Sequence, residues 1–420
     1  MLDVTLLYCN APTPSAAHRY GCQMPGPYAV PLSAAARRPI VVWNITRRCN
    51  LACEHCYSDS DASPAPAELS TVEAKAVLED LASFGVPAVL FSGGEPLMRP
   101  DVLDLIDTAG KLGLRTVLST NGTLIDLATA RRLAQSSLSY VGVSLDAADA
   151  ETHDRFRCRP GAYDKSLAAI SLLKNEGQKV GLRLTLTAHN ADLLNAVFEL
   201  IEEYRIDRVC FYHLIPVGRG GQFRPEGACL LLDPARTRSA MDTILARTRE
   251  ALADGRPLEV LTVDNHCDGP YLYLKLLAEN ALRAERVRQL LAWNGGGRFA
   301  AGVGIGCIDW EGNVHPNQFW RHYRLGNVRE KPFSELWTNK PRKGFLADPL
   351  LRALRNRLPY LKGRCARCRF KSLCGGSSRV RAELTTGDPW APDPACYLTD
   401  EEITQEEPYE KAPSLDLIEK

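Results

Sequence analysis

The chain has 420 residues, a length that suits one large α/β domain plus a smaller one. Its composition is that of an ordinary globular protein, and its net charge of +1 provides no field that would attract nucleic acid or an anionic membrane. No apolar run is long enough to span a bilayer and no signal peptide begins the chain, so we expect a cytoplasmic protein with neither nucleic acid nor membrane as partner.

The chain divides by texture into four predicted regions. Residues 1–38 are rich in Pro and Ala and are predicted to form an irregular N-terminal leader. From 39 to 230, short β-branched runs alternate with amphipathic stretches, which predicts parallel strands joined by right-handed helical crossovers. Residues 231–300 are predicted to be helical and to connect the core to a second domain, 301–420, rich in turns, glycines and cysteines.

Six strands and five helices are predicted in the 39–230 region. The capping box at Ser70–Glu73 marks the start of the first helix. The expected strands are Ile40–Thr46, Ala88–Ser92, Arg115–Ser119, Tyr140–Leu145, Gly181–Thr187 and Arg208–Leu214. The expected helices are Val72–Phe84, Val102–Leu112, Ala128–Gln135, Lys165–Lys174 and Ala191–Tyr204. Strand count alone does not separate a barrel from an open sheet.

Cysteine is the most informative residue type here. Fourteen cysteines in a reducing compartment are not expected to form disulfides, and seven of them fall in two groups with metal-binding spacing. In the first group, Cys49, Cys53 and Cys56 follow the first predicted strand, at the end of a parallel strand where ligand sites gather. Three thiolates on one loop leave one iron of a 4Fe–4S cluster open, whereas a zinc site would need a fourth ligand, for which His55 is at hand.

The spacing Cys-x3-Cys-x2-Cys with Tyr57 beside the last cysteine resembles the radical S-adenosylmethionine (SAM) superfamily. The resemblance implies a partial (β/α)6 TIM-like barrel in which SAM chelates the open iron. It further implies that an electron, from a donor such as flavodoxin or ferredoxin, cleaves SAM to a 5′-deoxyadenosyl radical.

Motifs at the ends of later predicted strands resemble the SAM-binding segments of the same superfamily. Ser92-Gly93-Gly94-Glu95-Pro96 is similar to the segment that holds the SAM amino group, although alone it reads as an ordinary turn. Arg183 is similar to a residue that meets the SAM carboxylate, and it suits a structural role at the core edge equally well. The SAM-binding residues implied by the resemblance are Gly93, Gly94, Glu95, Ser119, Asn121, Ser144, Arg183, Asn190 and Gly218.

The second cysteine group, Cys365, Cys368, Cys374 and Cys396, resembles the C-terminal SPASM or twitch extension of radical SAM enzymes. The resemblance implies one auxiliary 4Fe–4S cluster with four thiolate ligands, and a structural zinc ion is the alternative. Whether Cys307 binds a cluster stays open, because Asn317 stands where a further cysteine is expected. The other cysteines have no partner at ligand spacing and are predicted to be buried apolar residues: Cys9, Cys22, Cys158, Cys210, Cys229 and Cys267.

Segments 7–21, 302–330 and 374–398 resemble radical SAM enzymes that trim side chains of sirohaem-derived tetrapyrroles. The resemblance implies removal of acetate side chains from 12,18-didecarboxysirohaem, giving iron-coproporphyrin III in alternative haem biosynthesis. Its alternatives are an enzyme of haem d1 biosynthesis acting on propionates of the same substrate, and a peptide-modifying maturase. An electron carrier or haem-binding scaffold would instead fill all four irons of its first cluster.

A tetrapyrrole with several carboxylates needs cationic partners, and arginine suits them best. The candidates in the resembling segments are Arg321, Arg324, Arg379 and Arg381. His315 and His322 are candidates to bind the substrate iron or to move protons, and with Arg321 they are the catalytic candidates. For each one alone, a surface or structural role is the simpler interpretation.

Overall fold

The computed structural model describes residues 1–16, 20, 37–63, 65, 67–221, 230–338 and 347–405. Cys22, Cys229 and part of the 7–21 segment lie outside these residues. The described strands join in one eleven-stranded sheet with the order β1-β8-β7-β6-β5-β4-β3-β2-β9-β10-β11. No helix in the described ranges is both long enough and apolar enough to cross a bilayer.

Seven parallel strands, neighbours in chain order, form the centre of this sheet. The six predicted strands are confirmed to within two residues, and β8 is an addition in the segment predicted to be helical. It was missed because a short buried strand between helices shows no periodicity of its own. The strands are β2 (Ile40–Asn44), β3 (Val89–Ser92), β4 (Thr116–Thr120), β5 (Leu138–Ser144), β6 (Val180–Leu186), β7 (Arg208–His213) and β8 (Glu259–Val263).

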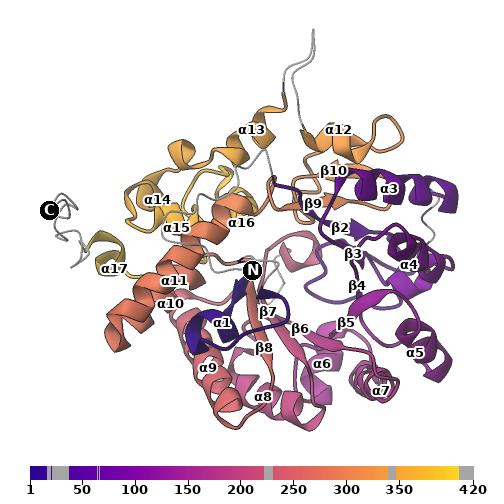
Figure 1. The fold of residues 1–420 in the computed structure, drawn as a ribbon, viewed down its shortest axis with the longest axis horizontal. Helices are drawn as coiled ribbons and strands as arrows, with labels where there is room; N and C mark the ends of the chain where they lie inside the picture. The colour runs from indigo at the N-terminus through magenta and orange to yellow at the C-terminus, as the bar shows by residue number, and fades with distance from the viewer. Residues whose placement is uncertain are drawn as a thin grey trace, which may run out of the picture.

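Helices surround the outside of the arc formed by these strands (Figure 1). The predicted capping box is confirmed: Glu73 N donates to Ser70 Oγ, and Ser70 N donates to the Glu73 carboxylate at 2.7 Å. The five predicted helices are present, and α6 is additional. The helices are α3 (Thr71–Phe84), α4 (Val102–Lys111), α5 (Leu127–Ala134), α6 (Ala150–Arg157), α7 (Ala162–Asn175), α8 (Leu194–Glu203) and α9 (Pro234–Ala253).

The start of the chain is not the irregular leader that its composition suggested. β1 (Leu2–Asp3) pairs antiparallel with β8, and α1 (Val4–Cys9) follows it directly. Asp3 caps α1 by accepting a hydrogen bond from Leu6 N at 2.9 Å, and Thr5 bridges to β8 through Val260 N. Such short elements are fixed by tertiary contacts, so the sequence pattern did not reveal them.

The other edge of the sheet belongs to the C-terminal region. β9 (Ile305–Ile308) runs parallel to β2, and β10 (Asn313–His315) and β11 (Gly326–Asn327) continue antiparallel. The sheet thus ends at β1 on one side and β11 on the other, which makes it a partial barrel, as expected. The domain boundaries themselves stay a prediction.

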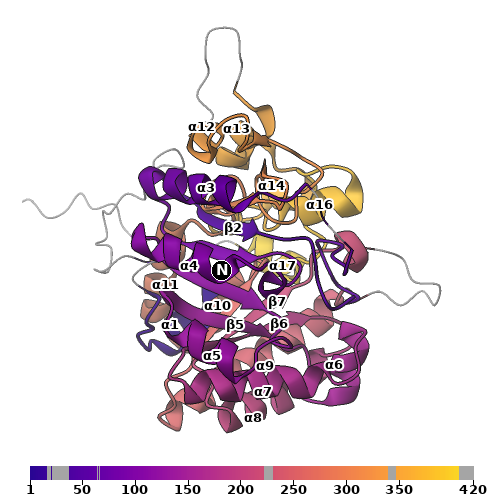
Figure 2. The same cartoon turned by 90° about the vertical axis from the view of Figure 1, so that its right-hand side faces the viewer.

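In Figure 2 the C-terminal helices α12, α13, α14 and α16 lie at one end of the molecule, above the barrel, and α17 lies lower. Two longer helices lead from β8 toward them. The elements are α10 (Asp268–Glu279), α11 (Ala281–Asn294), α12 (Phe333–Thr338), α13 (Pro349–Arg355), α14 (Gly363–Arg367), α15 (Lys371–Cys374), α16 (Arg379–Thr386) and α17 (Asp400–Thr404), with the 3-10 turns η1 (Pro96–Met98), η2 (Ala191–Leu193), η3 (Gly218–Gly221), η4 (Gly296–Phe299) and η5 (Leu358–Tyr360).

Candidate active site and auxiliary cysteine site

The first cysteine group lies on the loop after β2 and faces a cavity of about 170 Å³ at the carboxyl ends of the strands. The structure therefore brings the cysteine loop together with the later strand ends, as the parallel topology predicts. Predicted residues that line this cavity are Cys49, Cys53, Cys56, Gly93, Gly94, Ser119, Asn121, Ser144 and Arg183.

Two glycines after β3 let that strand end press against the cysteine loop. A Cβ atom on Gly93, whose φ is +140°, would lie 2.4 Å from Thr46 O, and one on Gly94 would lie 2.2 Å from Arg48 O. Both distances are far below van der Waals contact, so no side chain fits at either position. Gly94 N and Glu95 N donate to the same two carbonyl oxygens at 2.8 Å.

The loop after β7 holds the cysteine loop from the other side. Gly218 has a φ of +59°, and a Cβ atom there would lie 2.5 Å from Cys56 O. Arg219 donates from its backbone N to Cys56 O at 3.0 Å and from Nε to Cys53 O at 2.8 Å. Gly218 does not line the cavity, so the structure gives it a part in positioning the cysteines.

The electrostatic surroundings of the three thiols come from α6 and the end of β5. Arg157 donates from Nη1 to Cys53 Sγ at 3.6 Å and forms a buried ion pair with Asp146. Burial raises the pKa of Cys49 to about 12 and raises the pKa of Cys53 as well. Cys49 and Cys53 thus stay protonated until a metal displaces the proton, and Arg157 provides positive charge beside the Cys53 thiolate that results.

His55, the residue that a zinc site would recruit, is half-buried within the cysteine loop and lines the first cavity. Its ring stacks on Phe156 at a centroid distance of 4.3 Å, and burial lowers its pKa to about 4. A zinc ion holds each sulfur ligand at about 2.3 Å. Within the described residues, no three His, Cys, Asp or Glu side chains are arranged to hold one metal ion. The donor set of three thiols beside a cavity fits a larger cluster that keeps one iron for a small molecule.

Glu95 and Asn190 do not line the cavity. The buried carboxylate of Glu95 accepts hydrogen bonds from Thr120 Oγ1, Asn121 N and Leu97 N at 2.7–3.1 Å. Asn190 accepts from Thr187 N and donates to the carbonyl oxygens of Asp146 and Thr185, all at 2.8 Å. The structure thus gives both side chains partners at the strand ends in place of the expected SAM groups.

Arg183 differs from these two because its charge is free to meet a ligand. Its guanidinium lies 4.8 Å from the centroid of the Tyr212 ring and lines the cavity. The guanidinium makes no hydrogen bond or ion pair with any residue that the structure describes. A half-buried cation without a counterion favours an anionic ligand, such as the carboxylate expected from the resemblance.

The second cysteine group also converges in space. Cys365, Cys368, Cys374 and Cys396 line a small cavity of about 20 Å³ between α14, α15 and the segment before α17. A fifth cysteine, Cys267 at the start of α10, lines the same cavity.

Cys267 was expected to be an isolated buried cysteine, and the structure corrects this. It is fully buried, and its thiol lies within hydrogen-bonding reach of both Asn265 Oδ1, at 3.0 Å, and the Cys396 thiol. Its hydrogen bond, together with smaller effects, lowers the pKa of Cys396 to about 7. Spacing along the chain could not reveal this neighbour, because the next cysteine of the site, Cys365, lies 98 positions further along the chain.

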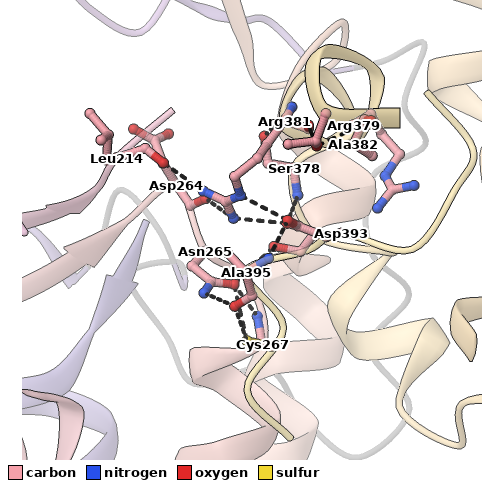
Figure 3. Close-up of polar contacts among 12 residues, drawn as sticks. Leu214, Asp264, Asn265, Cys267, Ser378, Arg379, Arg381, Ala382, Asp393 and Ala395 are labelled. Atoms are coloured by element: carbon pink, nitrogen blue, oxygen red, sulfur yellow. Dashed lines mark hydrogen bonds and ion pairs between the residues drawn. The ribbon is translucent and has the colours of Figure 1, made fainter. Parts of the chain in front are cut away.

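A buried ion pair joins this cysteine site to the barrel (Figure 3). Arg381 on α16 binds both carboxylate oxygens of Asp393, at 2.7 and 2.8 Å, and donates to Leu214 O and Asp264 O at the ends of β7 and β8. Asn265 Nδ2 donates to Ala395 O at 2.9 Å, next to Cys396. Arg381 thus connects the loop that carries Cys396 to the barrel, and its carboxylate partner is Asp393.

Known proteins match this chain over nearly its whole length. A model of the radical SAM superfamily matches residues 43–201, and a model of an iron–sulfur cluster-binding domain, SPASM, matches residues 304–369. The Fe-coproporphyrin III synthase of Methanosarcina barkeri is 50% identical over 96% of this chain and 99% of its own length. The chain belongs to the radical SAM superfamily.

Two further comparisons agree with that membership. The pre-heme d1 synthase of Dinoroseobacter shibae is 44% identical to this radical SAM enzyme over 86% of the chain and 87% of its own length. The crystal structure of Streptococcus suis SuiB superposes with a TM-score of 0.64 at 19% identity, over 86% of this chain and 78% of that one, which shows a shared fold. The superfamily brings SAM and a 4Fe–4S cluster as cofactors, and the SPASM domain brings additional iron–sulfur binding.

The histidines proposed for catalysis lie away from the cavities of this radical SAM enzyme. His315 is buried in β10, with Nδ1 2.8 Å from Tyr323 O and Nε2 3.2 Å from Asp309 Oδ2, so both ring nitrogens are occupied. His322 is 46% exposed and bonds to Glu383 at 3.0 Å. Neither lines either of the two cavities, so a role for them in catalysis stays a prediction.

Arg321 and Cys307 lie close to the cysteine loop without reaching the cavity. Arg321 donates to Tyr57 O at 3.2 Å and stacks over the Trp310 ring at 4.8 Å. Cys307, buried in β9, accepts a weak hydrogen bond from Asn44 Nδ2 at 3.8 Å and lines neither cysteine cavity. Of the remaining isolated cysteines, Cys210 is buried as expected, Cys9 is half-buried and Cys158 is exposed.

Several cavity residues were not predicted. Tyr212 and His213 end β7, where the position alone was a usable signal. Arg157 lies on α6, and Asp264 follows β8, two elements that the sequence pattern had not revealed. Asp264 is half-buried, and desolvation raises the pKa of its carboxyl group.

Proposed function

We propose that this radical SAM enzyme removes the acetate side chains of 12,18-didecarboxysirohaem and so produces Fe-coproporphyrin III in alternative haem biosynthesis. The observation that carries the proposal is the 50% identity, along almost the full length of both chains, with a protein named for that product. We place the reaction in the cytoplasm, with a flavodoxin or ferredoxin as electron donor.

The proposed residue roles follow the geometry of the two cysteine sites. Cys49, Cys53 and Cys56 would hold the SAM-binding cluster, and Arg183 would receive the SAM carboxylate. When bound, SAM and the cluster supply the 5′-deoxyadenosyl radical that abstracts a substrate hydrogen. The remaining SAM-contacting groups would be Ser119, Asn121, Ser144 and the backbone of Gly93 and Gly94.

The chain's own part in the chemistry is to bind, orient and exclude water. Arg157 offsets the negative charge of the thiolates, and the two glycine turns fix the cysteine loop against the strand ends. Cys365, Cys368, Cys374 and Cys396 would hold the auxiliary cluster, whose four thiolates leave no iron for SAM. That difference assigns SAM cleavage to the first site.

Mass spectrometry of an anaerobic reaction tests the proposal. Reconstituted enzyme is incubated with SAM, a reductant and 12,18-didecarboxysirohaem, and Cys53→Ala serves as the control that lacks a ligand of the first site. We expect loss of two acetate groups and two equivalents of 5′-deoxyadenosine per product.

Loss of propionate mass would instead assign the chain to the reaction class of the second relative, pre-heme d1 synthase. SAM cleavage with an unchanged tetrapyrrole would reject both functions.

A further inference from the structure

A second, larger cavity of about 440 Å³ lies beside the first. The end of β8 and the start of β9 both contribute to its wall, together with residues of the C-terminal region. Asp264, Gln318 and Phe319 line both cavities, so the two spaces adjoin. A large ligand that reacts in the first cavity therefore has room to extend into the second.

Two buried arginines form part of the wall of this larger cavity. Arg379, at the start of α16, is 1% exposed, and Arg357, just before η5, is 2% exposed. Arg379 donates from Nη1 to Pro389 O and Ala391 O, at 2.9 and 2.7 Å, while its Nε and Nη2 atoms have no partner. Arg357 donates to Leu354 O and Ala301 O at 3.1 and 3.0 Å.

Neither arginine has a carboxylate partner among the residues that the structure describes. Backbone carbonyl oxygens satisfy some N–H groups without supplying a counterion, which is costly in a buried position. Asp393 also acts on the charge of Arg379, but it forms its ion pair with Arg381. This cost is reflected in the pKa of Arg357, which is lowered to about 9 by burial and, to a smaller extent, by the nearby charge of Arg379.

Arg381, two residues after Arg379, is an arginine whose charge is balanced by a carboxylate. It is fully buried as well, yet both oxygens of Asp393 lie within 2.8 Å of its guanidinium. Figure 3 shows that the Arg379 side chain points away from this pair. The same helix therefore carries one arginine with its anion and one without.

We propose that Arg357 and Arg379 bind a peripheral carboxylate of the tetrapyrrole while the reacting side chain lies in the adjoining cavity. This subsite rests on the proposed function. The planar guanidinium presents paired N–H donors that match a carboxylate, and the unpartnered Nε and Nη2 atoms of Arg379 are such a pair. Phe299, Ile305 and Phe319 line the same cavity and give the macrocycle face an apolar surface.

A loaded auxiliary cluster is the competing source of negative charge. Cys365 and Cys374 lie close enough to Arg379 to influence its charge, so the thiolates of a cluster would offset part of it. A test must therefore read substrate affinity and the auxiliary cluster separately.

Titration of the holoenzyme with Fe-coproporphyrin III, followed by the shift of its Soret band, measures affinity without turnover. Arg357→Gln and Arg379→Gln should each raise Kd about ten- to hundredfold, the value of a lost charged hydrogen bond. Arg131→Gln is the matched control, because Arg131 is exposed, is paired with Glu176 and lies on α5, outside both cavities. Iron content and the midpoint potential of the auxiliary cluster are measured on the same samples.

The outcomes separate the possibilities. Weakened binding with unchanged iron and potential supports the subsite. Wild-type affinity in both variants overturns it, and a shifted potential would then assign the arginines to the cluster. Failure of the wild-type enzyme to bind the porphyrin would overturn the proposed function together with the subsite.

If a glutamine variant loses iron, Arg357→Lys and Arg379→Lys supply the measurement, because each keeps the charge and loses the planar fork. Binding about tenfold weaker than wild type is expected of them, and unchanged binding counts against the subsite.

Discussion

The two cysteine sites of this enzyme differ in how the chain encloses them. Three thiols of the first lie on one loop between residues 49 and 56, beside a cavity of about 170 Å³. The second takes its four thiols from two segments, gains Cys267 from a third, and leaves about 20 Å³. A site built on one loop keeps one side open to a small molecule, whereas a site enclosed by several segments suits a cluster that exchanges only electrons.

The largest effect is expected when one cysteine of either site is replaced. Cys53→Ala should abolish 5′-deoxyadenosine formation, while Cys374→Ala should keep SAM cleavage and lose tetrapyrrole turnover. Each variant should lose about four irons per chain, the content of one 4Fe–4S cluster. Iron analysis and electron paramagnetic resonance with and without SAM check this. A SAM-dependent spectrum in Cys53→Ala would reverse the two assignments.

The next effect concerns the joint between the second site and the barrel. Arg381→Ala leaves Asp393 as a buried charge without its partner, which should cost about 3–5 kcal/mol of unfolding free energy in urea titrations. Arg324→Ala, which removes a half-exposed ion pair, should cost less than about 1 kcal/mol. Equal losses would mean that the buried pair does not hold the two regions together.

Replacing both partners of this ion pair gives a sharper test of its contribution to stability. Arg381→Met combined with Asp393→Leu removes both charges, so it should recover most of the stability lost in the single variant. A double variant as unstable as Arg381→Ala would indicate that the lost hydrogen bonds to Leu214 O and Asp264 O dominate.

A pH effect on stability is expected from His153, which lies beside Asp146 near the first site. His153 is buried, accepts a hydrogen bond from Asp146 N at 3.2 Å, and has a pKa lowered by burial to about 4. The unfolded chain binds this proton near pH 6.5, so the stability contribution is complete above that pH and is lost as the pH falls toward 4. Between pH 7.5 and 5 the loss should be about 2 kcal/mol.

His153→Gln keeps an acceptor without a titrating ring, so its unfolding free energy should fall by about 2 kcal/mol less over this pH range than that of the wild type. His322→Gln, at an exposed position, should follow the wild type. Unfolding curves at pH 7.5, 6.5, 5.5 and 5 test this. If His153→Gln retains the full pH dependence, the proton is bound by another group.

The smallest expected effect concerns Cys267. Its proton can be donated to Asn265 Oδ1 or to Cys396 Sγ. If Cys396 receives it in the loaded site, Cys267→Ala should keep the iron content and lower the auxiliary potential by about 20–60 mV, the value of one hydrogen bond. Redox titration monitored by electron paramagnetic resonance measures this. An unchanged potential would mean that Cys267 donates its hydrogen bond to Asn265 Oδ1 instead.

The sequence predicted those parts of the molecule that carry a local signal. Six strands and the capping box at Ser70 show their periodicity or spacing directly, and the cysteine motifs predicted two groups that the structure does bring together. β1 and β8 were missed because long-range pairing creates them.

Side-chain direction was the harder part of the site. Glu95 and Asn190 stand in the expected motifs, yet their polar atoms bind neighbouring strand ends. His315 was proposed for catalysis, yet both of its nitrogens have partners between β9 and β11. A motif gives the residue's place in the chain, and the direction of its side chain depends on neighbours that are distant in sequence.

The pairing of β9 with β2 has a consequence for dissecting this protein. β9, which lies beyond residue 300, pairs with the side of β2 that faces away from β3. A chain truncated at residue 300 would therefore leave the backbone amides and carbonyls on that side of β2 unpaired. Exposed edges of this kind attract strands from other molecules. We expect the isolated N-terminal part to aggregate, so the two iron–sulfur regions have to be expressed as one chain.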